Sequence, residues 1–246
     1  MKTIVAVVLV TSFMLMSSCK ESVTDPNVLG GETNLDLTKP GNEVGAYLGI
    51  DGIGVPIEDS IFIVSNNNGI VTTRGWVQLN QASFRKLDTA FGTTALPVSV
   101  KYMLISAVLG PGTRVDTSVA GSVRFHIELK SRVTSEGIQD FRYSNGNESK
   151  PFMLVRYSDP VGTVYSFTDS TGRTIQRTVT LKAEKEDWSL GFLQVKSIRV
   201  DESVVDNPAY SKITYITNHK FGFIGTLVTM KNGRVFNLSF IPWAVV

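Results

Sequence analysis

The two histidines are considered first, because a histidine can act as a general base or as a metal ligand at neutral pH. His126 lies in an alternating stretch between Arg124 and Glu128, and His219 lies in the segment TNHKFG. A Ser-His-Asp triad needs a serine on a strained turn, and no G-x-S-x-G motif occurs. We therefore predict a surface position for His126 and a loop position for His219, and we nominate no catalytic residue.

Carboxylates could bind calcium or hydrolyse glycosidic bonds, and they gather in three short segments. These are DGIGVPIEDS at 51–60, KAEKEDW at 182–188 and VDESVVDNP at 200–208. None has the spacing of an EF-hand loop. Solvated turns and a charged strand end explain these segments more simply, so we predict no metal site and no cofactor.

Two tryptophans have polar neighbours and could stack on sugar rings from a flat sheet face. Trp76 stands in TTRGWVQL, and Trp188 stands in EKEDWSL. The alternative is that each ring fills a core, as tryptophans commonly do in sandwiches. Trp76 and Trp188 are therefore the candidate ligand-binding residues, with core packing as the competing interpretation.

The only cysteine, Cys19, follows the most apolar run of the chain. Lys2 precedes this run, which extends from Ile4 to Met16 and falls short of the roughly 20 residues that a spanning helix needs. A basic start with an apolar run of this length is typical of a secretory signal peptide. The segment Met16-Ser17-Ser18-Cys19 resembles the lipobox of bacterial lipoprotein precursors, with methionine in place of the usual leucine. The alternative is that Cys19 ends a plain signal peptide or a membrane anchor.

This resemblance covers residues 1–19 and implies that residues 1–18 are removed. It also implies that Cys19 becomes the mature N-terminus, with a diacylglyceryl group on its sulfur and an acyl chain on its amine. Two or more chains anchor a protein stably, whereas one chain does so only marginally. In that family an aspartate after the cysteine often means retention in the inner membrane, so Lys20 favours the outer membrane. The resemblance thus predicts a lipid-anchored envelope protein, and leaves open whether it faces the periplasm or the cell surface.

The charge of the chain argues against nucleic acid as a partner. Removal of residues 1–18 takes away Lys2, one of 24 basic residues, and none of the 22 acidic ones. The mature chain is therefore nearly neutral, and it lacks the basic patch that phosphate recognition requires. We expect the partners to be the membrane, through the lipid on Cys19, and an envelope protein or a glycan.

The chain after Cys19 predicts a tether followed by β structure. Residues 19–44 are rich in Gly, Pro, Asn and Thr and lack a period, which favours a flexible tether. An alternative is an edge strand at 34–37. From residue 45, strand patterns alternate with turn signals, which predicts antiparallel β-sandwiches that are Ig-like in architecture only. We place two sandwiches at 45–145 and 146–246, with one larger β domain over 45–246 as the alternative.

Four segments carry most of this prediction. In residues 122–132 apolar and polar residues alternate strictly, which predicts a strand with one buried face. The apolar run 98–109 suggests a long strand, and residues 83–91 suggest one short helix. The last hairpin has Asn232-Gly233 at its turn, which predicts a type I′ turn with Leu227 opposite Leu238. Its core face would then carry Phe223, Leu227, Phe236, Leu238 and Phe240.

Two functions fit this sequence. The first is a non-catalytic envelope lipoprotein that binds or braces a partner, and the second is an envelope hydrolase acting on glycan or peptide. A deep pocket with converging ionisable groups would favour the hydrolase. A flat aromatic face, an apolar patch or an unpaired strand edge would favour the binding module.

Overall fold

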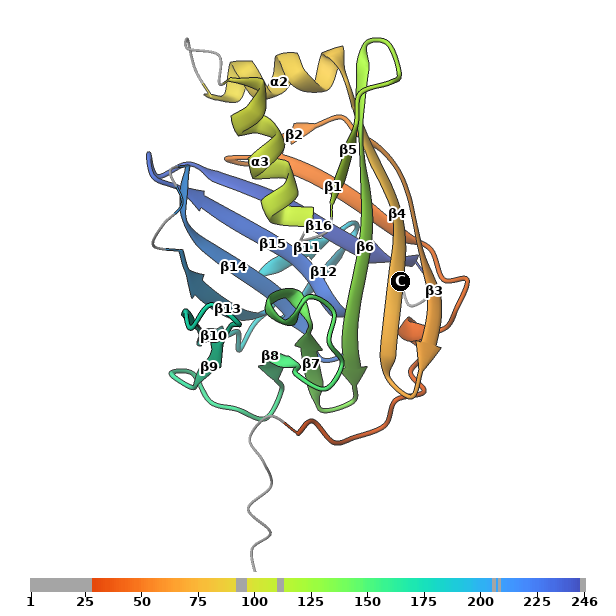
Figure 1. Cartoon of the computed structure of the whole chain (residues 1–246), viewed down its shortest axis with the longest axis vertical. Helices are drawn as coiled ribbons and strands as arrows, with labels where there is room; N and C mark the ends of the chain where they lie inside the picture. Colours follow the sequence, from red (N-terminus) through yellow and green to blue (C-terminus); the bar gives the residue numbers. More distant parts are fainter. Residues whose placement is uncertain (1–27, 92–96, 110–112, 205–206, 208, 244–246) are drawn as a thin grey trace, which may run out of the picture.

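The computed structural model describes residues 28–91, 97–109, 113–204, 207 and 209–243. The predicted signal peptide, the lipobox with Cys19 and the first part of the predicted tether lie outside the described residues. In the described part, two large antiparallel sheets dominate the molecule (Figure 1).

The larger sheet has eight strands, and its neighbours in space are not always neighbours in sequence. In spatial order they are β2 (Ile53–Val55), β1 (Val44–Ile50), β16 (Val235–Pro242), β15 (Gly222–Met230), β14 (Tyr210–Asn218), β13 (Ile198–Ser203), β10 (Thr174–Lys182) and β9 (Val164–Thr168).

The second sheet faces the first and has six strands. Its order is β3 (Glu58–Asn67), β4 (Ile70–Asn80), β6 (Ser122–Thr134), β7 (Gly137–Asp140) and β8 (Phe152–Arg156), with β5 (Arg114–Asp116) paired to β6. A separate hairpin consists of β11 (Trp188–Leu190) and β12 (Leu193–Val195).

Strand β6 shows how the sequence produces this architecture. Val123, Phe125 and Ile127 are buried, whereas Arg124 and His126 point to the opposite, partly exposed face. Because successive side chains of a strand point to opposite faces, this alternation gives a sheet with one apolar side. Two such sheets bury their apolar sides against each other, so the predicted all-β sandwich is confirmed.

Strands from the two halves of the chain are interleaved. Strand β1 pairs with β16 over the whole of Val44–Ile50, and β7 pairs with β8. A cut near residue 145 would separate both pairs. One hydrophobic cluster also contains buried residues from both halves, including Leu48, Phe125 and Phe236.

The expectation of at most one short helix is wrong, because there are two α-helices in the described residues. Helix α2 (Gln81–Phe91) is the predicted one. Helix α3 (Val98–Leu109) occupies the run that suggested a long strand. An apolar run without a period cannot be assigned from pattern alone, and its length of 12 residues is in fact more typical of a buried helix.

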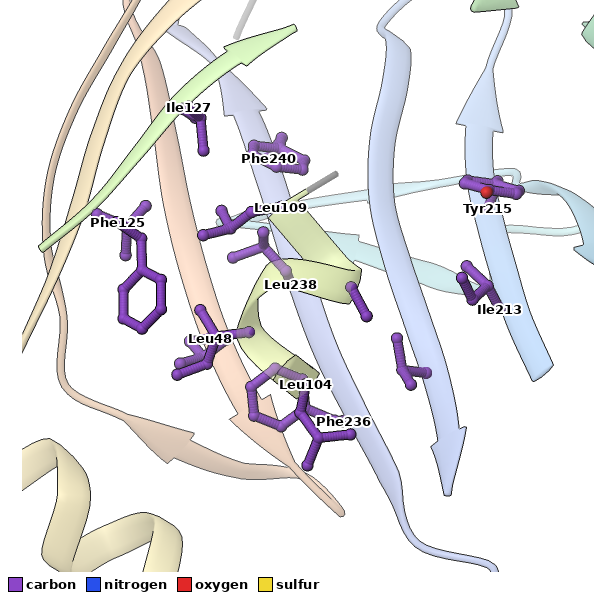
Figure 2. Close-up of a cluster of buried hydrophobic side chains, with 14 of the residues drawn as sticks. Leu48, Leu104, Leu109, Phe125, Ile127, Ile213, Tyr215, Phe236, Leu238 and Phe240 are labelled. Carbon is purple, nitrogen blue, oxygen red and sulfur yellow. The ribbon is translucent and has the colours of Figure 1, made fainter. Parts of the chain in front are cut away.

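Helix α3 lies between the two sheets (Figure 2). Its Tyr102 ring meets the Phe125 ring of β6 edge-on, with centroids 5.7 Å apart, while the helix packs on β15 and β16 on its other side. Leu104 and Leu109 are each 1% exposed. A helix with its side chains is about 10–12 Å across, so α3 keeps the sheets apart where it lies between them.

The last hairpin forms, but its predicted register is wrong by one residue. Leu227 pairs with Asn237 rather than with Leu238. The loop has three residues, 231–233, and only Gly233 among them has a positive φ, of 84°. A type I turn followed by a left-handed glycine therefore replaces the predicted type I′ turn. Phe236, Leu238 and Phe240 still lie in the main core, but Leu227 faces the other side of the sheet.

The described part of the predicted tether packs against the β domain. Leu29 is buried, and the Val28 carbonyl accepts a hydrogen bond of 3.0 Å from Arg156 Nη2. The Glu32 backbone and Ser135 exchange two hydrogen bonds of 2.9 Å. A 3-10 turn, η2 (Asp36–Thr38), stands where the alternative placed an edge strand.

We expect Leu104→Ala and Ile105→Ala each to lower the free energy of unfolding by about 2–5 kcal/mol, because each removes a fully buried aliphatic side chain. Val98→Ala is the matched control on the same helix, since Val98 is 54% exposed, and it should change stability by less than about 0.5 kcal/mol. Urea unfolding measures all three. Two neighbouring core positions that cost nothing would contradict the placement of α3.

Candidate functional site

Trp76 lies on the outer face of the six-stranded sheet. It follows Gly75 on β4 and alternates with the buried Val77. The Arg124 guanidinium sits over its ring at 4.3 Å from the centroid. This cation–π contact already covers one face of the ring.

Trp188 lies elsewhere, on the β11–β12 hairpin. It packs on a second hydrophobic cluster that covers the far side of the eight-stranded sheet and includes Leu190, Ile216 and Phe221. Its ring also approaches the bare backbone of Gly225. The two candidate tryptophans are therefore on different sheets and do not form one site, and sugar binding at either stays a prediction.

The two histidines lie in different parts of the fold, and His126 borders a surface hollow that Arg74, Arg114 and Glu128 also line. His126 is on the outer face of β6, with its Nε2 3.8 Å from Asp116, and His219 is exposed in the turn between β14 and β15. Within the described residues, no three His, Cys, Asp or Glu side chains are close enough to bind a metal ion. Among the acidic segments, Asp201 is paired with Lys212 at 2.9 Å, and Asp51 accepts a hydrogen bond from the Val235 backbone.

The site that the structure does present is a cavity of about 450 Å³ between the two sheets. Its lining includes Leu109 at the end of α3, Ile61 on β3, Ile127 on β6 and Phe240 on β16. Each of these four side chains is at most 5% exposed. Figure 2 shows Leu109, Ile127 and Phe240 in the buried cluster. The volume is within the roughly 300–1,000 Å³ of ligand pockets, and an apolar lining of this kind is typical of them.

The cavity reaches the surface on one side. Its lining includes the exposed residues Glu128 on β6 and Asn145 and Gly146, which follow the 3-10 turn η3 (Arg142–Ser144). Both residues after the turn have a positive φ, 53° at Asn145 and 79° at Gly146. This turn places Asn145 and Gly146 at the opening of a mainly apolar space.

A cluster of buried charges lies beside that opening. Arg177 on β10 is fully buried and forms ion pairs with Asp140 of β7 at 2.8 Å and with Glu202 of β13 at 2.9 Å. Its guanidinium also stacks on the rings of Phe152 and Tyr215, 4.1 and 4.7 Å from their centroids. A buried cation is tolerated only when it is paired in this way.

The carboxylate of Glu202 is held in its charged form. Burial alone would raise its pKa, but the charges of Arg177 and Arg142 and the hydrogen bonds from Tyr143 and Arg177 outweigh burial. The pKa of Glu202 therefore lies below its usual value. The hydroxyl of Tyr215 donates a further hydrogen bond of 3.0 Å to it.

Three members of this cluster also line the cavity: Asp140, Arg142 and Tyr215. Arg142 Nη1 donates a hydrogen bond of 2.9 Å to the Tyr215 hydroxyl, and the Arg142 backbone N–H donates one of 3.0 Å to Asp140. Burial raises the pKa of Tyr215, so the hydroxyl stays protonated at neutral pH. The cavity thus has apolar walls and one polar end.

The sequence contained a signal for part of this cluster. In the alternating strand β10, Arg177 stands between the buried Ile175 and Val179, and Glu202 on β13 follows the buried Val200 at the same spacing. Two opposite charges at inward positions of separate strands indicate a buried pair. No pattern pointed to Asp140, on β7 of the other sheet, or to Arg142, in the 3-10 turn η3 that follows β7.

No protein-family model, no curated protein and no solved structure matches this chain. Of the helices in the described residues, none has both the length and the apolar character needed to cross a membrane.

We expect Glu202→Gln to lower the free energy of unfolding by about 3 kcal/mol at pH 7, because it breaks a buried charge pair on one side. The folded-state pKa of Glu202 is depressed, so its stabilisation is fully present above the unfolded-state pKa of about 4.3 and is lost as the pH falls through the folded-state value. The difference between wild type and variant should therefore shrink on acidification. Urea unfolding at pH 7 and pH 3 measures it.

The matched control is Glu184→Gln, because Glu184 is exposed. This variant should unfold like the wild type at both pH values. A penalty for Glu202→Gln that is the same at pH 7 and pH 3 would contradict the assignment of a charged, paired Glu202.

Proposed function

We propose that the chain is a lipid-anchored lipoprotein of the bacterial cell envelope, and that its β domain is a non-catalytic binding module for an apolar small molecule or acyl chain. The anchor would be lipid on Cys19, with the outer membrane as the expected location. An envelope protein or a glycan stays a predicted further partner, and the proposal for the cavity does not depend on it.

The observation that carries the binding proposal is the cavity of about 450 Å³ with aliphatic and aromatic walls. Each methylene group that moves from water into such a space contributes about 0.8 kcal/mol. A chain of ten methylenes would therefore supply roughly 8 kcal/mol before the costs of association are subtracted. An apolar ligand is the class that this lining stabilises best.

The ionisable groups at the polar end favour binding over catalysis. A general base works best with a pKa near the operating pH. The pKa of Glu202 is instead lowered, and both Glu202 and Asp140 are engaged by Arg177. These carboxylates are arranged to stabilise a buried cation, so a hydrolase is the less favoured function.

The anchor is tested by Cys19→Ala in a bacterial host fed with an alkyne-labelled fatty acid. We expect the label on the wild-type protein to be lost in the variant, because the sulfur that would carry the diacylglyceryl group is absent. The variant should retain its uncleaved signal peptide. Ser17→Ala is the control, since it keeps a small residue in the lipobox, and it should label like the wild type. A labelled Cys19→Ala protein would refute the anchor.

The cavity is tested by Thr226→Phe. Thr226 is 1% exposed and its side chain lines the cavity, so a phenyl ring there should occupy the ligand space. The assay is the fluorescence of N-phenyl-1-naphthylamine, a neutral apolar dye, with the detergent-free chain from Lys20 onward, which keeps every described residue. We expect dye binding by the wild type and at least tenfold weaker binding by the variant.

The control for this substitution is Thr229→Phe, on the same strand but on the opposite face, away from the cavity. It should bind the dye like the wild type. A wild type that does not bind the dye, or a Thr226→Phe variant that binds it equally well, would count against an apolar binding site.

A further inference from the structure

The cavity is asymmetric, and its asymmetry bears on the kind of molecule that would fill it. At one side Ile61, Leu109 and Phe240 form buried apolar walls. At the other side Arg142 lines the space, with its Nη1 on the hydroxyl of Tyr215, three residues before the exposed Asn145 at the opening. A ligand that matches both sides has an apolar chain for the interior and a polar group for the end near solvent.

The hydrogen bonds already formed within the cluster of buried charges indicate which polar group a ligand would bring. Arg177, Asp140 and Glu202 satisfy one another, and the Tyr215 hydroxyl donates to Glu202. The acceptors of the cluster are therefore in use.

In contrast, not all hydrogen-bond donors of the Arg142 side chain are in use. A guanidinium carries five N–H donors, and the Arg142 side chain makes a single hydrogen bond within the described residues, from Nη1 to Tyr215. Its Nε and Nη2 donors have no partner in the described part of the chain. The group that the cavity lacks at this end is an acceptor.

We infer that the ligand is a single-chain amphiphile with a carboxylate head group, which accepts hydrogen bonds from Arg142 while its alkyl chain fills the cavity. This inference rests on the proposed function, because it needs the cavity to bind an apolar chain. A carboxylate matches a guanidinium better than a hydroxyl or an amide does, since two charge-assisted hydrogen bonds form in parallel.

The size of the cavity agrees with one chain. A water-sized group, close to the size of a methylene, takes roughly 30 Å³, so about 450 Å³ holds on the order of 15 such groups. A phospholipid with two long chains would need about twice that space. A long-chain fatty acid is therefore the class of ligand that fits both the volume and the polar end.

The experiment compares dodecanoate, dodecanol and dodecylamine as competitors of N-phenyl-1-naphthylamine, with the detergent-free chain from Lys20 onward. The three share one alkyl chain and differ only in the head group. The wild type should bind dodecanoate at least tenfold more tightly than dodecanol, and dodecylamine most weakly.

Arg142→Met should bring the affinity for dodecanoate down to that for dodecanol, while the dye and dodecanol bind as before. Arg142→Lys should keep most of the preference for the acid, because the cation remains. Lys130→Met is the matched control, since Lys130 also lines the cavity but is paired with Glu148 at 2.8 Å, and it should leave the preference unchanged.

The outcomes distinguish a failure of the proposed apolar binding site from a failure of the inferred carboxylate ligand. A wild type that binds neither the dye nor the amphiphiles overturns the proposed function and this inference together. Equal affinity for dodecanoate and dodecanol overturns the inference alone. So does an acid preference that survives Arg142→Met, or one that Lys130→Met removes in its place.

Discussion

The separation of the two sheets by α3 is the constraint on which the rest of the structure depends. Sheets that face each other directly lie about 10 Å apart and fill that gap with their own side chains. Here Tyr102 of α3 contacts Phe125 of one sheet while the helix packs on β15 and β16 of the other. The helix ends at Leu109, and the cavity of about 450 Å³ begins there. The cavity is therefore the space that α3 holds open without filling.

The buried ion pairs join the sheets at the other side of this space. Asp140 belongs to the six-stranded sheet, whereas Arg177, Glu202 and Tyr215 belong to the eight-stranded sheet. Moving these charges out of water is costly, and apolar residues of equal volume would often be at least as stable. What the charges add is a set of directional hydrogen bonds and ion pairs that link the two sheets. That arrangement sets the position of Tyr215, and through it the position of Arg142 at the opening of the cavity.

The two parts of the proposed function rest on separate parts of the chain. The lipid anchor depends on residues 1–19, where a short apolar run and a single cysteine follow one another. The binding site depends on strands, α3 and η3, which begin well after the anchor. Hydrogen bonds of residues 28–33 to β3, to β8 and to the turn between β6 and β7 connect the two parts, since they hold the start of the domain beside its six-stranded sheet. A failure of one proposal therefore leaves the other standing.

The sequence by itself determined the class of fold and most of its strands, because alternation along β6 and the hairpin signal at Asn232-Gly233 are local properties of the chain. It also predicted α2, but it treated the segment with Glu202 as a solvated turn, whereas Glu202 and Arg177 are both buried. The pattern of residues 98–109 did not decide between strand and helix, since an apolar run without a period is compatible with both. Its length of 12 residues favoured the helix, which the structure places between the sheets. Nor did it place Asp140 and Arg142 beside Arg177, because a pattern along one strand reports which face is buried and carries no information about which element lies opposite. The cavity and its polar end are therefore products of the tertiary structure, where segments far apart in sequence meet.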